Sequence, residues 1–265
     1  MSFYAKSFVY DSIASENFNI EIANTDSGNG IISSPGSGKI SILESYIYRR
    51  PVPFFLGIHF DSRLSFPVSF FSPDEINALD ISYIQSWLFS KSQYKSLVII
   101  QPDLDETILN CIFTDPTILR AGNIIYGISG LCEVNSQFAY TYPKTVTYNY
   151  STPPSSSLIT FFNNSHYSGY LYPSMTLTMN STGGSVTIIN ASDADREFTF
   201  TSLSPNEILT INNDLGIVTS SLNVLRIANF NKKFLRFIPG LNQLYVTGDI
   251  SKLVLTYQFV RRFGG

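Results

Sequence analysis

Hydrophobic and polar residues alternate along much of this 265-residue chain. The pattern is clearest from residue 207 onwards, where apolar residues recur at every second position in short runs separated by Asn-Asp, Pro-Gly and Gly-Asp pairs. Such alternation predicts half-buried strands, and these pairs are typical of tight turns. No nucleophile, acid–base pair or metal-ligand cluster accompanies the strands, which favours a structural or binding protein over an enzyme.

The first half of the chain also consists mainly of predicted strands. They cover residues 3–10, 18–22, 40–48, 54–60, 64–71, 97–100, 108–113 and 122–138. Pro67 lies inside one of these runs and predicts a sheet edge or a bulge, because proline has no N–H to donate.

One segment has a helical period instead. Ser72 is a natural N-cap, Pro73 suits the first helical position, and apolar residues follow every three or four positions. The predicted apolar stripe is Ile76, Leu79, Tyr83, Ile84, Trp87 and Leu88. We expect a helix at about 73–89 that Trp87 and Leu88 anchor in the core.

A Pro- and Ser-rich stretch at 148–157 predicts a boundary between two domains, 1–147 and 148–265. Beyond it the pattern predicts only strands, at 158–163, 175–179, 186–190, 198–203, 208–212, 218–220, 222–227, 234–237, 243–247 and 252–260. So many short strands predict a β-sandwich of the jelly-roll type. Pro239 and Gly240 predict a type II turn between two of these strands, and Asn242 is grouped with them as a structural anchor.

The composition is low in charge, with 44% hydrophobic and 14% charged residues. Neutral, aromatic-rich surfaces suit a protein in contact with partners, but an ordinary all-β composition explains the numbers equally well. Residues 1–147 carry nine Lys or Arg against fourteen Asp or Glu, a net −5, and residues 148–265 carry eight against six, a net +2. Neither half is basic enough to indicate stable nucleic-acid binding.

The two cysteines, Cys111 and Cys132, are too few for a disulfide framework and are predicted to be buried free thiols. The first residues do not resemble a secretion signal, and no apolar run approaches the ~18 residues that cross a bilayer. We therefore expect a protein that is made in a cytosol and does not insert into a membrane.

Several residue groups resemble cofactor or metal sites but fail at defining positions. The Ser34–Lys39 run lacks the first glycine of a phosphate-binding loop, and Ile40 stands where that motif needs Ser or Thr. Carboxylates at 103, 105 and 106, and at 193 and 195, predict turns, with a weak calcium site as the alternative. His59 and His166 lie in different predicted domains, so they cannot make a typical transition-metal site. We expect no catalytic residue, no metal and no cofactor.

Two segments leave alternatives open. The aromatic run F-F-N-N-S-H-Y-S-G-Y-L-Y-P at 161–173 suits either a sugar-binding face or rings that pack in the core and between subunits. The Gly- and Ser-rich segment 23–39 has only Ile31 and Ile32 as large apolar residues in its second half. It is either a flexible surface loop or an arm that contacts a neighbouring subunit through these two isoleucines.

Motifs in both halves resemble those of a known family. The first half contains I-Y-R-R-P-V-P-F-F-L-G-I-H-F from Ile47, then L-S-F-P-V-S-F-F-S-P-D-E, I-Q-S-W-L-F and Y-K-S-L-V-I-I-Q-P-D. The second half contains the aromatic run above, E-I-L-T-I-N-N-D at 207–214 and F-L-R-F-I-P-G-L-N-Q-L-Y-V-T-G at 234–248. In this order, over about residues 47–259, they resemble the distal tail protein (Dit) family of bacteriophages with long non-contractile tails.

The resemblance implies a mainly β protein of two β-sandwich domains. The first domain, with its one helix, would form a hexameric ring, and the second would be galectin-like, with its last strand either kept or returned to the first domain. Such a protein is a non-enzymatic virion component of the tail tip, synthesised in the bacterial cytoplasm. It joins the tail tube protein to the tail hub or fibre protein and to the receptor-binding protein, while DNA passes through the lumen without specific binding. The net −5 of the first half agrees with a non-basic lumen.

Two other classes remain as alternatives. A carbohydrate-binding module or lectin-like adhesin would bind glycans as a monomer and would not need residues 1–147. A capsid or fibre jelly-roll protein would build shells or fibres instead of rings. The segment 23–39 has no recognised counterpart in the distal tail family.

Overall fold

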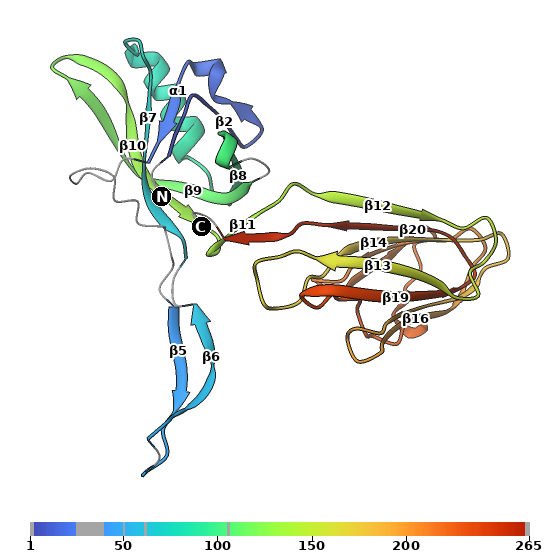
Figure 1. Ribbon diagram of the computed structural model, residues 1–265. Coiled ribbons are helices and arrows are strands. Elements are labelled where there is room, and N and C mark those ends of the chain that lie inside the picture. Colours follow the sequence, from blue (N-terminus) through green and yellow to red (C-terminus); the bar gives the residue numbers. More distant parts are fainter. Residues whose placement is uncertain (1–2, 25–39, 50, 61–62, 105–106, 263–265) are drawn as a thin grey trace. The chain divides into compact units, whose positions relative to one another are not determined.

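The computed structural model describes residues 3–262 except 25–39, 50, 61–62 and 105–106. The described residues are mainly strands, with one α-helix and the short 3-10 helices η1 (Ser15–Phe18), η2 (Pro102–Leu104) and η3 (Ile227–Asn229), so the predicted mainly β class is confirmed. The chain divides into two compact units (Figure 1). The first runs up to Thr141 and includes the C-terminal end from Arg261, and the second is Tyr142–Val260.

The boundary between the units differs from the expected one after residue 147. It lies after Thr141 because β12 (Lys144–Asn149) pairs along its whole length with β20 (Ile250–Tyr257) of the second unit. The Pro- and Ser-rich stretch therefore connects β12 to β13 (Ser157–Asn163) inside one unit.

A ten-stranded sheet forms the first unit, in the order β1-β4-β7-β10-β9-β8-β2-β3, with β11 paired to β9 and β21 paired to β11. Its strands are β1 (Tyr4–Ala5), β2 (Ser7–Tyr10), β3 (Ile13–Ala14), β4 (Glu21–Ala23), β7 (Ser65–Phe71), β8 (Lys95–Ile100), β9 (Ile108–Ala121), β10 (Ile124–Val134), β11 (Phe138–Tyr140) and β21 (Val260–Arg262). The described strands of this unit thus form one ten-stranded sheet, together with a separate two-stranded sheet that is described below.

Proline is tolerated in β7 because one side of the strand is open at that point. Pro67 lies opposite Leu131 of β10, but β4 pairs with β7 only from Ser69 to Phe71. Among the described residues, Pro67 therefore lies beyond the paired part of β7 on the β4 side. This is the local sheet edge that the sequence predicts.

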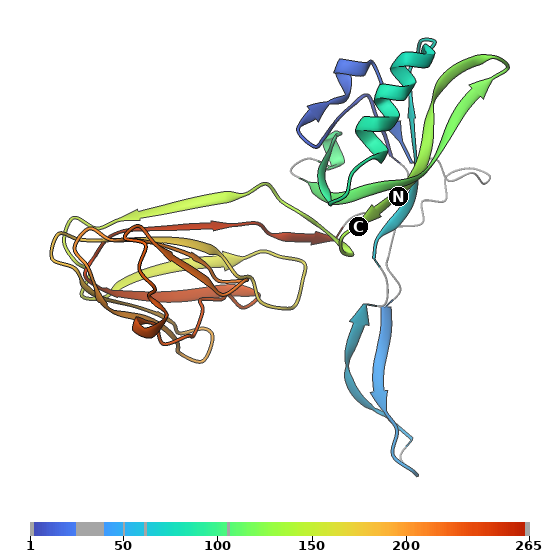
Figure 2. The ribbon, with the colours of Figure 1, turned by 180° about the vertical axis from the view of Figure 1, so that it is seen from behind.

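The helix α1 (Ala78–Phe89) packs against β9 and β10 (Figure 2). Its N-cap is Asn77, whose side-chain oxygen accepts hydrogen bonds from the amides of Leu79 and Asp80 at 3.0 and 2.9 Å. These bonds satisfy two of the amides that the first turn of a helix leaves without backbone partners.

The expected helix start at residue 73 is wrong. The Ser72 hydroxyl instead accepts a hydrogen bond from the Asp74 amide in a local turn. The Ile76 amide donates to the Ile125 carbonyl at 2.9 Å, which ties the segment before the helix to β10. Ser72 thus caps a turn, because hydrogen bonding to β10 holds the backbone that the helix would need.

The buried stripe of the helix also differs from the predicted one. Leu79 and Tyr83 are exposed, whereas Ile81, which the prediction left out, is buried together with Ile84. Trp87 stacks on Phe8 and Phe18, with ring centroids 5.8 and 4.9 Å apart, and its indole N–H donates to the Tyr10 carbonyl at 3.2 Å. Leu88 is fully buried beside it in the same core.

Two antiparallel sheets form the second unit and enclose a second core. The five-stranded sheet has the order β12-β20-β14-β17-β18, and the four-stranded sheet has the order β13-β19-β15-β16. The strands not yet given are β14 (Ser174–Met179), β15 (Gly184–Asn190), β16 (Arg196–Leu203), β17 (Ile208–Asn212), β18 (Ile217–Ser220) and β19 (Gly240–Gly248). The strand predicted at 222–227 is instead a loop, and the one predicted at 234–237 makes only the isolated bridge Leu171↔Phe237.

The Pro239–Gly240 turn leads into β19 from an irregular segment, so it does not join two full strands as predicted. Gly240 has a φ of +82°, the value that type II turns place at their second central residue. The buried Asn242 side chain braces the turn: its oxygen accepts from the Ile238 amide at 2.9 Å. Its nitrogen donates to the carbonyls of Ile238 and Gly240 at 2.9 and 3.0 Å.

Replacing Trp87 with alanine should lower the free energy of unfolding of the first unit by about 3–5 kcal/mol, because it removes a buried aromatic side chain. Tyr83→Ala is the matched control on the same helix, and since its ring is exposed it should change stability by less than about 0.5 kcal/mol. Urea unfolding followed by circular dichroism measures both. A loss under about 1 kcal/mol for Trp87→Ala would contradict the packing described here.

Gly240→Val should destabilise the second unit by about 1–2 kcal/mol, because a β-branched residue is strained at positive φ, whereas Gly240→Asn should be mild. A Cβ at this position would meet no atom within 4 Å, so the backbone alone sets the difference. Thermal unfolding of the two variants compares them directly. Equal melting temperatures would show that the turn relaxes out of the left-handed conformation.

Candidate functional site

The residues predicted as anchors do not come together in one site. The pair Trp87–Leu88 lies in the core of the first unit, and the turn Pro239–Asn242 lies in the second unit. The predicted contact pair Ile31 and Ile32 falls outside the described residues, as does the Ser34–Lys39 run.

The structure gives no metal-ligand cluster in the part of the chain that it describes. No group of three or more His, Cys, Asp or Glu side chains there could hold a metal ion. The turn predicted at 193–195 is confirmed. Asp193 in this turn forms an ion pair with Arg236. The structure does not describe the side chains of four predicted candidates, which are His59 and the acidic residues at 103, 105 and 106. No described helix is long and apolar enough to cross a membrane.

The predicted buried free thiols are confirmed. Burial is the main cause that raises the pKa of the Cys132 thiol, and the adjacent Cys111 raises it further. Both cysteines belong to the core of the first unit. Both thiols are fully buried in this core, so these cysteines act as packing residues.

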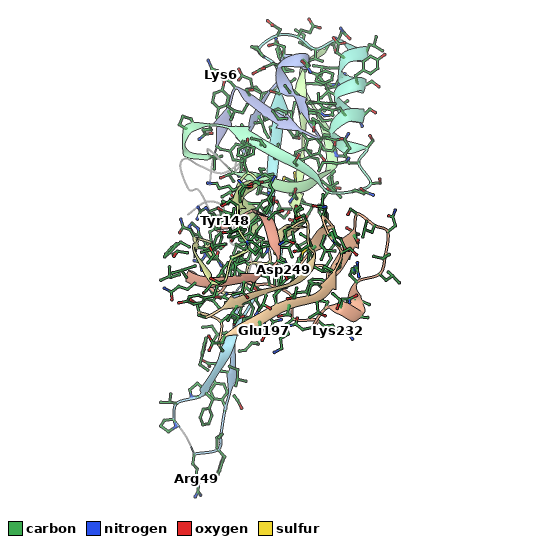
Figure 3. The ribbon with its side chains drawn as sticks, turned by 90° about the vertical axis from the view of Figure 1, so that its right-hand side faces the viewer. Lys6, Arg49, Tyr148, Glu197, Lys232 and Asp249 are labelled. Atoms are coloured by element: carbon green, nitrogen blue, oxygen red, sulfur yellow. The ribbon has the colours of Figure 1, made fainter. Side chains whose placement is uncertain are left out.

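A two-stranded hairpin is the most unusual feature of the first unit. Strands β5 (Ile40–Ser45) and β6 (Phe54–Phe60) pair only with each other, in a sheet of their own (Figure 1). The register shifts between Leu43 and Glu44, and the β6 partner of Leu43 is Gly57, whose φ of +143° only glycine adopts easily. Arg49 marks the far end of the hairpin (Figure 3).

Exposed apolar side chains cover both faces of this hairpin, which we call the β5–β6 hairpin. They are Ile42, Leu43, Tyr46, Ile47, Tyr48, Val52, Phe54, Phe55 and Leu56. The consecutive residues Phe54, Phe55 and Leu56 are all exposed, so neither face is the polar one that a solvated hairpin needs. A two-stranded hairpin is at best marginally stable alone in water, and large exposed apolar patches mark interaction surfaces. The geometry therefore indicates a surface that another protein covers.

The second unit holds a loop in place with a buried ion pair. The Glu207 carboxylate is fully buried and accepts hydrogen bonds from Nε and Nη2 of Arg226 at 2.8 and 2.7 Å. It also accepts bonds from the Ser220 hydroxyl and the Ser204 amide. Burial alone would raise the pKa of Glu207, but these hydrogen bonds, led by those of Arg226, outweigh it and lower the pKa below its ordinary value.

The loop that carries Arg226 presents apolar side chains to solvent. Leu222, Val224, Leu225 and Ile227 are all exposed, and Leu225 is 90% exposed. The Glu207–Arg226 pair fixes the C-terminal end of this segment, beside the exposed side chains of Leu225 and Ile227. We call residues 222–227 the apolar loop.

A third group combines aromatic rings with an ion pair. The Arg236 guanidinium lies 3.7 Å from the centre of the Tyr170 ring and is bonded to both oxygens of Asp193, at 2.7 and 3.2 Å. The hydrogen bonds to Asp193 are the main cause that raises the pKa of Arg236, and Tyr172 also contributes a hydrogen bond. Tyr170 and Tyr172 are both exposed, while Leu171 between them is buried.

Local sequence patterns contain only partial signals for these three surfaces. The predicted strand at 54–60 has the observed bounds of β6. The prediction did not use the fact that the apolar residues of this strand do not alternate, which is the signal for a hairpin without a polar face. The ion pairs join residues that are 19 and 43 positions apart, and no local pattern marks such partners.

Two family models match the chain and together span most of it. Residues 3–136 match the model of a phage tail protein N-terminal domain, and residues 138–257 match that of a phage tail C-terminal domain. The models meet close to the boundary between the two units of the structure. No curated protein sequence matches the chain closely enough to count as a relative.

Solved structures share the fold over almost the whole chain. The Dit protein of phage SPP1, described as a paradigm of the hub adsorption apparatus in phages that infect Gram-positive bacteria, matches with a TM-score of 0.66 at 11% identity. A chain of the phage p2 baseplate, solved in its activated conformation with Sr, matches with a TM-score of 0.55 at 10% identity. Each match covers 97% of this chain and 99% of the other. At these identities the likeness shows the fold, and the two family models show the family.

The two family models together match almost the whole chain, which is therefore a member of the phage tail protein family.

Proposed function

We propose that this protein is a structural subunit of the distal end of the phage tail, where copies of it form a ring. The observation that carries the proposal is the β5–β6 hairpin, whose apolar side chains are exposed on both faces. A surface of this kind suits a permanent neighbour, because removal of apolar area from water favours association.

The neighbour that fits the hairpin is a second copy of the chain. Glu44 and Arg49 are the only charged side chains described in the hairpin, and Glu44 already accepts a hydrogen bond from Tyr46. A neutral apolar surface of this kind suits a protein partner and not a nucleic acid. The hairpin also has two strand edges that pair with nothing else among the described residues. A contact that each copy makes with the next through different surfaces gives a ring when the rotation between copies closes.

The distal-tail resemblance supplies the rest of the proposal. The ring has six subunits, and it joins the tail tube protein on one side to the hub or fibre protein on the other. The second unit, a galectin-like sandwich, reaches the receptor-binding apparatus. The protein performs no catalysis and is made in the bacterial cytoplasm before it enters the virion. The net −5 of residues 1–147 lets DNA pass through the lumen without adhering.

The apolar loop of the second unit supports contacts away from the ring. The buried Glu207–Arg226 pair holds it rigidly, so a partner that buries Leu225 and its neighbours has little ordering entropy to overcome. A rigid apolar loop of this kind suits a permanent neighbour in the tail, such as the hub or fibre protein.

Replacing Phe55 with aspartate should prevent ring formation without unfolding the chain, because the ring of Phe55 is exposed in the single subunit and a charge there opposes burial. Mass measurement in solution should give a sixfold assembly for the wild type and a monomer for the variant. A cooperative thermal unfolding transition of the Phe55→Asp monomer should show that this variant is folded. Leu225→Asp, in the apolar loop, is the matched control and should still assemble. A wild-type chain that is monomeric both in solution and when recovered from tails, or a Phe55→Asp chain that assembles normally, would contradict the proposal.

The Glu207–Arg226 pair predicts that the free energy of unfolding of the second unit depends on pH. Since the folded pKa of Glu207 lies below its unfolded value of about 4.3, the stabilisation is present above that value and is lost as the pH falls through the folded pKa. At pH 7, Arg226→Ala should cost the second unit about 3–5 kcal/mol, because it leaves a buried charge unpaired.

Urea unfolding at a series of pH values measures this effect. The difference between Arg226→Ala and the wild type should shrink as the pH falls from the unfolded pKa of about 4.3 through the lower folded pKa of Glu207. Lys252→Ala, an exposed cation on β20, is the control and should show neither effect. A stability difference that stays constant from pH 7 to pH 3 would argue against this role of the pair.

A further inference from the structure

Two exposed tyrosines and an ion pair lie together on the surface of the second unit. Tyr170 and Tyr172 point outward while Leu171 between them is buried and its backbone bridges to Phe237. Their ring centroids are 6.3 Å apart, with the ring planes at 65°. The two rings therefore form an angled pair on the surface of the second unit, with 42% of Tyr170 and 36% of Tyr172 exposed.

Polar groups beside these rings are fixed in place from several directions. Arg236 stacks on the Tyr170 ring and holds both carboxylate oxygens of Asp193. The backbone carbonyl of Arg236 accepts a hydrogen bond from the Asn190 side chain at 3.0 Å, and that side chain also donates to Asn242 at 3.0 Å. The polar groups are thus held by the same buried network that braces the turn before β19. Such preorganisation lowers the entropy lost when a ligand binds.

The charge of the group selects the class of ligand. Asp193 and Arg236 neutralise each other, so an anionic ligand would meet a carboxylate next to the cation and gain little. A neutral polyol can instead accept hydrogen bonds from the guanidinium and the tyrosine hydroxyls and donate to the carboxylate. The exposed ring faces suit the apolar C–H face of a sugar ring.

We propose that Tyr170, Tyr172, Asp193 and Arg236 form a binding site for a neutral carbohydrate. The tyrosine rings provide the stacking surface. Arg236, whose side chain is 25% exposed, provides most of the directional hydrogen bonds, and Asp193, at 8% exposed, mainly orients the guanidinium. The site lies wholly within the second unit, so it does not depend on the ring proposed above.

The test is binding of the full-length protein to an array of immobilised neutral oligosaccharides built from glucose, galactose, rhamnose and N-acetylglucosamine, with sialylated and phosphorylated glycans alongside. The wild type should bind at least one neutral glycan, and Tyr170→Ala should weaken that binding by about fivefold, which corresponds to the loss of about 1 kcal/mol from a stacking ring. Tyr170→Phe, which keeps the ring, should retain most of the binding. Tyr83→Ala removes an exposed tyrosine from the first unit and should bind as the wild type does.

Melting temperatures check that each variant is folded, and Tyr172→Ala gives a second test of the site if Tyr170→Ala is unstable. The proposal is overturned if the wild type binds no neutral glycan, if it binds only the sialylated or phosphorylated ones, or if both alanine variants in the site bind as well as the wild type. Ring assembly is measured separately by mass, so a failure here leaves the ring proposal standing.

Discussion

A two-stranded hairpin with apolar side chains on both faces is not a stable surface in water, and this constraint shapes the first unit. In the β5–β6 hairpin the three consecutive residues Phe54–Leu56 are exposed, and the strands pair with no others among those described. The ten-stranded sheet and its helix can bury a core of their own, but the hairpin has no such core. We propose that a neighbouring molecule stabilises it, because a two-stranded hairpin is marginal alone in water and a large exposed apolar patch marks a contact surface.

The second unit buries its own hydrophobic core, and some of its surface segments present apolar or aromatic side chains to solvent. Its two sheets enclose a complete core, and buried polar side chains hold selected surface segments in fixed positions. Glu207 positions the apolar loop through Arg226, and Asn242 braces the turn before β19. In both places a buried polar group with all of its hydrogen bonds made determines which apolar or aromatic side chains face outward.

Much of the fold follows from local patterns in the sequence. The bounds of β17 agree with the alternation of apolar residues, and so does the sandwich of the second unit. The helix start was misplaced because Ser72 can cap either a helix or a turn, and hydrogen bonds to β10 select the turn. The strand expected at 222–227 is instead a loop, and a long-range ion pair fixes its C-terminal end beside exposed apolar residues. Such partners lie far apart in the chain, so local pattern does not reveal them.

The position of the protein in the virion is the most direct test of the account. Antibodies raised against the purified chain can be bound to intact phage particles, labelled with gold and located by electron microscopy. The account predicts label only at the end of the tail away from the head, at the junction between the tail tube and the adsorption apparatus. Label distributed along the tail tube, or found on the head, would contradict it.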